Sequence, residues 1–356
     1  MAGRRPVAGL VVGVVMAACG GSPAATTTGS PTTAVTVTLT ATSSTTAATT
    51  TTAASTTSAP TLEVVKDVEY HHASGWTTNT LDIYYRPGAQ GGPVVVLFHG
   101  QPVPKDFPLY AEIASALVDR GAVVFVPDWG NPAATAAVTP DPVEARAAQF
   151  VEDDAASCAV SYALATAEQY GADPERLVLF GHSAGSSVTS VVALRTADPF
   201  PDCAVSMTPF VAKGMVLWEG DWLLQDPTFD YLGEAIPMMQ EAIAPWYWLA
   251  AGPRLAVAHF VAAGSIAELT RCGASDPAGW YPLRDPDGWF RDRLEAIGAF
   301  DDDCIDVSEP TRVLADEMRA QGYDVTEISL PDSSHTVLRG EDLATLVDEV
   351  MRIADR

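Results

Sequence analysis

The chain reads Leu-Val-Leu-Phe-Gly-His-Ser-Ala-Gly at residues 177–185, an apolar run followed by a serine between two glycines. The run predicts a buried strand, and the residues after it (186–196) predict a helix. A serine on so sharp a turn needs small neighbours because other backbone segments pass close to it, and the two glycines meet that need. The turn would also direct the Ala184 amide towards the space beside the serine oxygen, at the positive end of the helix. The pattern predicts that Ser183 is a nucleophile, with a helix-capping serine as the alternative.

Strands and helices alternate on both sides of this stretch. Residues 94–98 and 122–126 are apolar without polar alternation, which indicates strands covered on both faces of a parallel sheet. Helical patterns lie between them and near the C-terminus (107–120, 142–170 and 343–351). Residues 81–85 alternate and predict an antiparallel edge strand. The order predicts an α/β fold with a doubly wound, mostly parallel sheet.

Two motifs make the chain resemble the α/β-hydrolases of the secreted esterase and lipase kind, over about residues 80–350. One is the Gly-His-Ser-Ala-Gly motif at 181–185, and the other is Phe-His-Gly-Gln at 98–101, at the end of a predicted strand. The resemblance implies an oxyanion hole formed by the amides of Gln101 and Ala184. The His-Gly-Gly-Gly form of the second motif, common in such hydrolases, is absent here.

The resemblance also implies that the catalytic base follows Ser183 in the chain, where only two histidines lie. His259 falls within the apolar run 255–263, which predicts a core residue. His335 follows a predicted strand (323–330) and a loop, and precedes the last helix, where similar hydrolases carry their catalytic histidine. We therefore expect His335 to be the base and His99 to be structural.

The resemblance also implies an acidic residue that orients His335 and completes a Ser-His-acid triad, but the sequence does not determine which residue this is. Glu268 is favoured if the long stretch 269–306 is an insertion that follows the acid, and Asp303 or Asp306 if the insertion precedes it. An acid after the preceding strand, such as Asp221, remains a further alternative.

Five cysteines are present, and Cys19 lies apart from the rest in the N-terminal segment. The other four allow three pairings, and an exported protein favours disulfides over free thiols. We expect Cys158–Cys203, which would join the helix before the nucleophile to the strand after it. We also expect Cys272–Cys304, which would close the inserted loop.

The N-terminal segment has the pattern of an export signal and a tether. Residues 1–19 begin with two arginines, continue as an apolar run too short to span a bilayer, and end Met-Ala-Ala-Cys. This end resembles a bacterial lipobox, so we expect a signal peptide with lipidation of Cys19; an ordinary signal peptide or a single membrane anchor are the alternatives. Residues 20–61 are rich in Thr, Ser and Ala and predict a disordered linker, and residues 62–356 the hydrolase domain.

The negative charge is confined to the hydrolase domain. The net charge is −25, and all 45 acidic residues follow residue 61. Such an acidic body would repel phosphate backbones and anionic membrane surfaces, which argues against nucleic-acid binding and against any membrane contact other than a lipid anchor. The acidic cluster at 301–306 lacks the spacing of a calcium-binding loop, so a solvated turn is favoured and no metal or cofactor is expected.

Residues 210–250 interrupt the alternation with many aromatic side chains and predict a helical cap over the site. Such a cap is consistent with a bulky apolar substrate, but core packing of the cap onto the body is the favoured explanation for most of these rings. The sequence thus predicts an exported, surface-anchored serine carboxylesterase acting on small-molecule esters. A catalytically degenerate surface binding protein, or a peptidase or polyester hydrolase, is the alternative.

Overall fold

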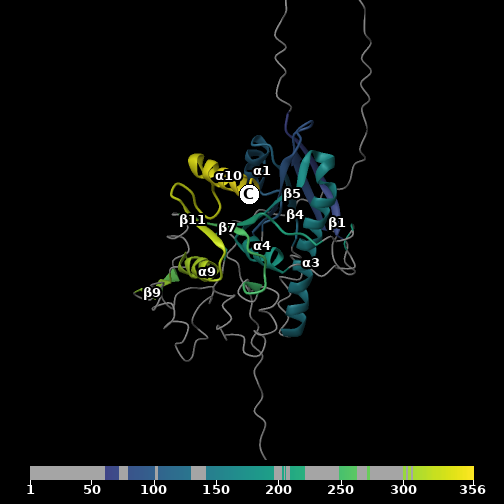
Figure 1. Cartoon of the computed structure of the whole chain (residues 1–356). Helices are drawn as coiled ribbons and strands as arrows, with labels where there is room; N and C mark the ends of the chain where they lie inside the picture. Colours follow the sequence, from purple (N-terminus) through teal and green to yellow (C-terminus); the bar gives the residue numbers. More distant parts are fainter. Residues whose placement is uncertain are drawn as a thin grey trace, which may run out of the picture. The chain divides into compact units, whose positions relative to one another are not determined.

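The computed structural model is shown in Figure 1. It describes residues 61–71, 79–100, 103–129, 142–195, 203, 205, 209–220, 248–262, 271–272, 300–301, 304–305 and 308–356.

The described residues form one large sheet and helices on both of its faces. The strands of this sheet are β1 (Glu63–His71), β2 (Asn79–Tyr85), β3 (Gly92–Phe98), β4 (Val123–Pro127), β5 (Ala172–His182), β6 (Gly214–Trp218), β7 (Ala256–Ala262) and β11 (Asp324–Leu330). The helices are α1 (Pro108–Asp119), α3 (Pro142–Thr166), the short 3-10 helix η1 (Ala167–Tyr170), α4 (Ala184–Leu194), α9 (Ser308–Ala320) and α10 (Gly340–Ala354). A small second sheet contains β8 (Arg271–Cys272), β9 (Phe300–Asp301) and β10 (Cys304–Ile305).

The large sheet has the order β1-β2-β4-β3-β5-β6-β7-β11. The pairs β1–β2 and β2–β4 are antiparallel, and the remaining pairs are parallel. The predicted doubly wound, mostly parallel sheet is therefore confirmed. One detail was wrong. The strand at 81–85 (β2) is antiparallel, as predicted, but it is not the edge strand, because β1 pairs with it on the outer side and forms the edge of the sheet. Its buried Leu81 and Ile83 fit this inner position.

The position of strand β3 in the sheet explains why its sequence is apolar without interruption. Val94, Val96 and Phe98 pack into the core on one face, with residues from α3 and α4, whereas Val95 and Leu97 pack on the other, with residues from α1 and α10. Both faces of the strand are thus covered by helices, as its sequence predicted.

The cysteines lie close to one another in the predicted pairs. Cys158 on α3 forms a disulfide with Cys203, with a Cα–Cα distance of 5.3 Å. Cys272 and Cys304 are register partners in the antiparallel pair β8–β10. Their side chains are outside the described part of the structure, so the second disulfide stays a prediction.

Several expected segments lie outside the described residues. These are the signal peptide (1–19), all but residue 61 of the linker (20–61), residues 221–247 of the predicted cap (210–250) and most of the inserted loop (269–306). The start of the predicted cap belongs instead to the large sheet, because residues 214–218 form β6. Within the described part of the chain, no helix has the length and apolar character needed to cross a membrane.

Candidate active site

Ser183 lies on a sharp turn between β5 and α4. Its backbone has φ 54° and ψ −126°, a positive-φ conformation that residues other than glycine rarely adopt. The Ser183 amide donates to the carbonyl oxygen of Trp218 on β6, at 2.9 Å. A Cβ atom on Gly181 would overlap the Gly185 carbonyl, and one on Gly185 would overlap the Phe98 carbonyl. The glycines of the motif are therefore required by close backbone approach, as predicted, and the strained residue between them is the serine.

His335 lies in the loop between β11 and α10 and is bound to a buried carboxylate. Its Nδ1 is 2.6 Å from Oε2 of Glu219, whose side chain is only 3% exposed. Glu219 directly follows β6 and has a left-handed backbone with φ 53°. Because Nδ1 must donate to the carboxylate, Nε2 of His335 is the nitrogen left for a reacting group.

The turn that carries Ser183 (the elbow) and the loop that carries His335 (the histidine loop) are joined by a direct contact. His182, the residue before Ser183, is 2.7 Å from the main-chain oxygen of His335 through its Nε2. The two imidazole rings also lie against each other, with centroids 4.7 Å apart. This contact brings His335 to the same end of the sheet as Ser183.

The turn that follows β3 lies against the serine. A Cβ atom on Gly100 would be 2.9 Å from Ser183 Cβ, so no larger residue fits there without displacing the serine. The Gly100 amide donates to the Tyr110 hydroxyl at 2.7 Å, which occupies that donor. An oxyanion donor from this turn must therefore come from a later residue, and the expected Gln101 lies outside the described residues. Ala184, the other expected donor, begins α4 beside Ser183.

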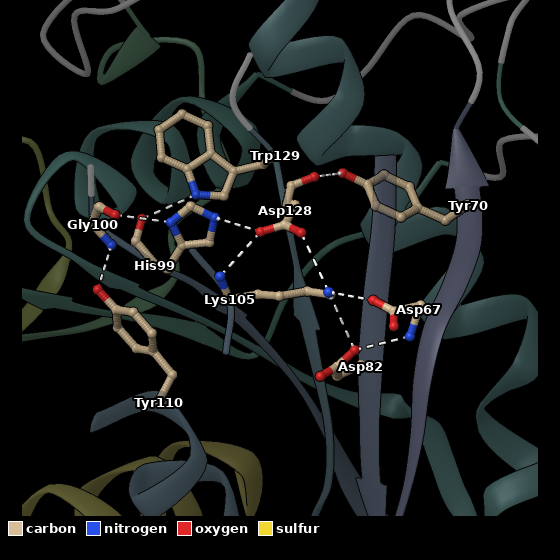
Figure 2. Close-up of polar contacts among 9 residues, drawn as sticks. All are labelled: Asp67, Tyr70, Asp82, His99, Gly100, Lys105, Tyr110, Asp128 and Trp129. Atoms are coloured by element: carbon tan, nitrogen blue, oxygen red, sulfur yellow. Dashed lines mark hydrogen bonds and ion pairs between the residues drawn. The ribbon is translucent and has the colours of Figure 1, made fainter. Parts of the chain in front are cut away.

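His99 links this turn to Asp128, as Figure 2 shows. Its Nδ1 donates to the Gly100 carbonyl at 2.8 Å, and its Nε2 is 3.4 Å from an Asp128 carboxylate oxygen. Its main-chain oxygen accepts a hydrogen bond from the Trp129 indole at 3.0 Å. His99 is 6% exposed and makes structural contacts, in agreement with the structural role predicted for it.

The Asp128 carboxylate belongs in turn to an ion cluster around Lys105 (Figure 2). The Lys105 ammonium is 2.8 Å from Asp67, 3.4 Å from Asp82 and 3.4 Å from Asp128. Burial alone would lower the pKa of Lys105, but the hydrogen bond to Asp67 and the nearby carboxylates outweigh it and raise the pKa. Burial acts to raise the pKa of Asp128, yet the hydrogen bonds from His99 and the Lys105 amide hold it below its ordinary value. Through Lys105, the cluster links Asp67 on β1 and Asp82 on β2 to Asp128, which directly follows β4.

A family model described as the alpha/beta hydrolase family matches residues 95–349. The chain belongs to this family. In this α/β-hydrolase the serine elbow, the turn after β3 and the histidine before the last helix all fall within the matched residues. None of the curated proteins compared with the chain matches it.

Solved structures similar to this α/β-hydrolase share its fold. A thermophilic esterase from the Planctomycetes species Thermogutta terrifontis, with propionate bound, has a TM-score of 0.52 at 16% identity and covers 82% of this chain and 92% of its own. An inhibited esterase B from Lactobacillus rhamnosis has a TM-score of 0.54 at 12% identity and covers 83% of this chain and 86% of its own. At such low identity these likenesses establish the fold alone.

The carboxylate on His335 was not among the predicted candidates. Glu268, Asp303, Asp306 and Asp221 all lie outside the described residues, whereas the structure places Glu219 on the imidazole. The favoured candidates follow the strand nearer the C-terminus, whereas the observed carboxylate follows β6, the strand paired with β5. This is the location of the further alternative, an acid after the earlier strand, although the residue named there was Asp221. The signal that was missed is a glutamate placed immediately after a five-residue apolar run, at the carboxyl end of a strand.

His182, Glu219 and His335 also have possible metal-ligand atoms within 4.8 Å of one another. Both nitrogens of His182 are already in hydrogen bonds, and Nδ1 of His335 is bound to Glu219. A metal would have to replace these bonds, so the arrangement as it stands suits proton transfer better than metal coordination.

His259, the other histidine that follows Ser183, is fully buried on β7, where burial lowers its pKa to about 3, in agreement with the predicted core position.

Proposed function

We propose that the chain is a serine carboxylesterase in which Ser183, His335 and Glu219 form the catalytic triad. The observation that carries the proposal is the hydrogen bond between His335 and the buried Glu219, next to the strained Ser183. Glu219 takes the role that the sequence had left to Glu268. The names of structurally similar proteins, which include two esterases, support the same reaction class.

In the proposed reaction, the Ser183 hydroxyl oxygen attacks the ester carbonyl carbon while Nε2 of His335 accepts its proton. The buried carboxylate of Glu219 stabilises the imidazolium that forms. The amides of Ala184 and Gln101 would hold the negative oxygen of the tetrahedral intermediate. His335 then returns the proton to the departing alcohol, leaving an acyl-enzyme on Ser183.

Water completes the cycle by the same route. His335 takes a proton from water as its oxygen attacks the acyl carbon, and then protonates Ser183 as the carboxylic acid leaves. Each proton that His335 accepts is returned within the same half-reaction, so the cycle needs no cofactor. The aromatic residues of the 210–250 segment support a preference for apolar esters.

Export to the cell surface is part of the same proposal. The Met-Ala-Ala-Cys sequence that ends at Cys19 supports cleavage before that residue and lipidation of its thiol. Mass spectrometry of the mature N-terminal peptide tests this, and an unmodified Cys19 in the membrane fraction would overturn it.

The esterase proposal is tested by labelling with a fluorophosphonate, which reacts with activated serines, and by hydrolysis of p-nitrophenyl esters of increasing acyl length. Ser183→Ala should abolish both signals. Ser190→Ala, which changes a buried serine on α4, the helix that follows Ser183, serves as the matched control and should retain both. No Ser183-dependent label on the wild-type protein would refute the enzyme and favour a binding protein with a hydrolase fold. Faster cleavage of p-nitroanilides than of esters would instead indicate a peptidase.

A further inference from the structure

His182 and Tyr110 connect three separate segments of the site. Nε2 of His182 contacts the main-chain oxygen of His335 at 2.7 Å, and Nδ1 contacts the Tyr110 hydroxyl at 3.0 Å. The same hydroxyl accepts a hydrogen bond from the Gly100 amide at 2.7 Å, a contact drawn in Figure 2. The turn after β3, the elbow and the histidine loop are therefore linked by two side chains.

The chemistry of the partners leaves only one direction for each hydrogen bond. A carbonyl oxygen can only accept, so Nε2 of His182 carries the proton and donates to His335. Burial lowers the pKa of His182 well below its ordinary value, so its other nitrogen is unprotonated and accepts. Burial also raises the pKa of Tyr110, so its hydroxyl keeps its proton and donates it to His182. Each group of the chain is thus satisfied in a single tautomer.

Packing fixes the imidazole of His182 in that orientation. The ring is buried, and its centroid is 4.3 Å from that of Trp218, the residue before Glu219. The Trp218 carbonyl also accepts the hydrogen bond from the Ser183 amide. A displacement of His182 would therefore reach the nucleophile, the base and the strand that carries the acid.

We propose that Tyr110 and His182 are positioning residues that hold the β3 turn, Ser183 and His335 in register for catalysis. This proposal rests on the proposed esterase function. Neither side chain is required to touch the substrate. Their contribution is to keep the base and the oxyanion side of the site at fixed positions relative to the nucleophile, where small displacements reduce the rate strongly.

The test compares Tyr110→Phe, His182→Gln and His182→Ala with the wild-type protein. Hydrolysis of p-nitrophenyl butyrate is measured as kcat per site titrated with fluorophosphonate, together with KM and the melting temperature. Tyr323→Phe is the matched control, because it removes another buried hydroxyl that donates a hydrogen bond, here to the Leu249 carbonyl at 2.8 Å, at the opposite end of the parallel strands.

Tyr110→Phe should lower kcat roughly tenfold with KM changed less than about twofold, because the Gly100 amide and His182 each lose a partner. His182→Ala should lower kcat roughly a hundredfold, and His182→Gln should recover part of that loss because its amide can still donate to the His335 carbonyl. Tyr323→Phe should keep the wild-type kcat per titrated site.

Unchanged kcat per site in a folded Tyr110→Phe protein would overturn the positioning role while leaving the esterase intact. A wild-type protein without Ser183-dependent activity would overturn both. If the His182 variants do not fold, Tyr110→Phe still decides, because it keeps the buried ring and removes only the hydroxyl.

Discussion

Replacement of Glu219 by glutamine removes the negative charge of a carboxylate that is hydrogen-bonded to His335. Glutamine has nearly the same shape, so the packing around the residue should be kept. Its amide can still accept a hydrogen bond from Nδ1, or it can rotate and present its NH₂ group. Rotation would favour the wrong tautomer of the imidazole, with the proton on the nitrogen that must act as base.

The size of the effect follows from the geometry. The Nδ1–Oε2 distance is 2.6 Å, and the Glu219 side chain is 3% exposed, so the carboxylate faces the imidazolium with little solvent screening. Taking the charge centres as about 4 Å apart and an effective dielectric constant of about 20, the attraction is about 4 kcal/mol. At about 1.4 kcal/mol for each tenfold change in rate, Glu219→Gln should lower kcat about 10³-fold.

The assay is steady-state hydrolysis of p-nitrophenyl butyrate at pH 8, with enzyme concentration taken from absorbance and folding checked by thermal unfolding. Two further variants are measured alongside. Glu268→Gln tests the acid that the sequence had favoured, and Glu349→Gln removes a carboxylate of similar burial, bound to Arg352 on α10. Only Glu219→Gln should lose activity. A Glu219→Gln protein within threefold of wild type, or a 10³-fold loss in Glu268→Gln, would refute the assignment.

Three further outcomes are expected from the fold. Gly185→Ala should lower the free energy of unfolding by about 1–3 kcal/mol in urea denaturation, because its Cβ would overlap the Phe98 carbonyl; unchanged stability would contradict the predicted clash. Burial raises the pKa of Asp154 to about 7, above the ordinary value near 3.9, so the contribution of Asp154 to stability should fall as the pH rises from about 4 to 7. Asp154→Asn should therefore melt higher than wild type at pH 8 and nearly equally at pH 4, and a gap independent of pH would count against the reasoning. Reduction of Cys158–Cys203, which closes a loop with a sequence separation of 45, should cost up to about 4 kcal/mol of unfolding free energy, measured with and without dithiothreitol; no change in urea midpoint would argue against the bond.

The parts of the site that were predictable are those encoded in a short stretch of chain. The motif around Ser183 contains its own strand, its own turn glycines and the start of its own helix, so local pattern was sufficient. The place of His335 was predictable because only two histidines follow the serine and only His335 lies in the loop directly before the last helix. The apolar run at 94–98 predicted a strand buried on both faces, and the structure confirms it for β3.

The contacts of Glu219, the proposed acid, and of the proposed positioning residues could not be predicted from local sequence. Glu219 and His335 are 116 residues apart, and the sequence contains 45 acidic residues with no local feature that links one of them to the histidine. Tyr110 appears in the sequence as one apolar position of an amphipathic helix, and its hydroxyl gains its role only from groups on β3 and β5.

The sequence by itself determined the alternating architecture, the sharp turn at Ser183 and the place of His335 before the last helix, because hydrophobic periodicity and glycine spacing act over a few residues. Only the tertiary structure decided which carboxylate meets His335 and which buried side chains hold the site together. The physical reason is that parallel strands bring their carboxyl ends to one edge in an order set by the sheet. The strand order β5-β6-β7-β11, and not distance along the chain, placed Glu219 beside the nucleophile.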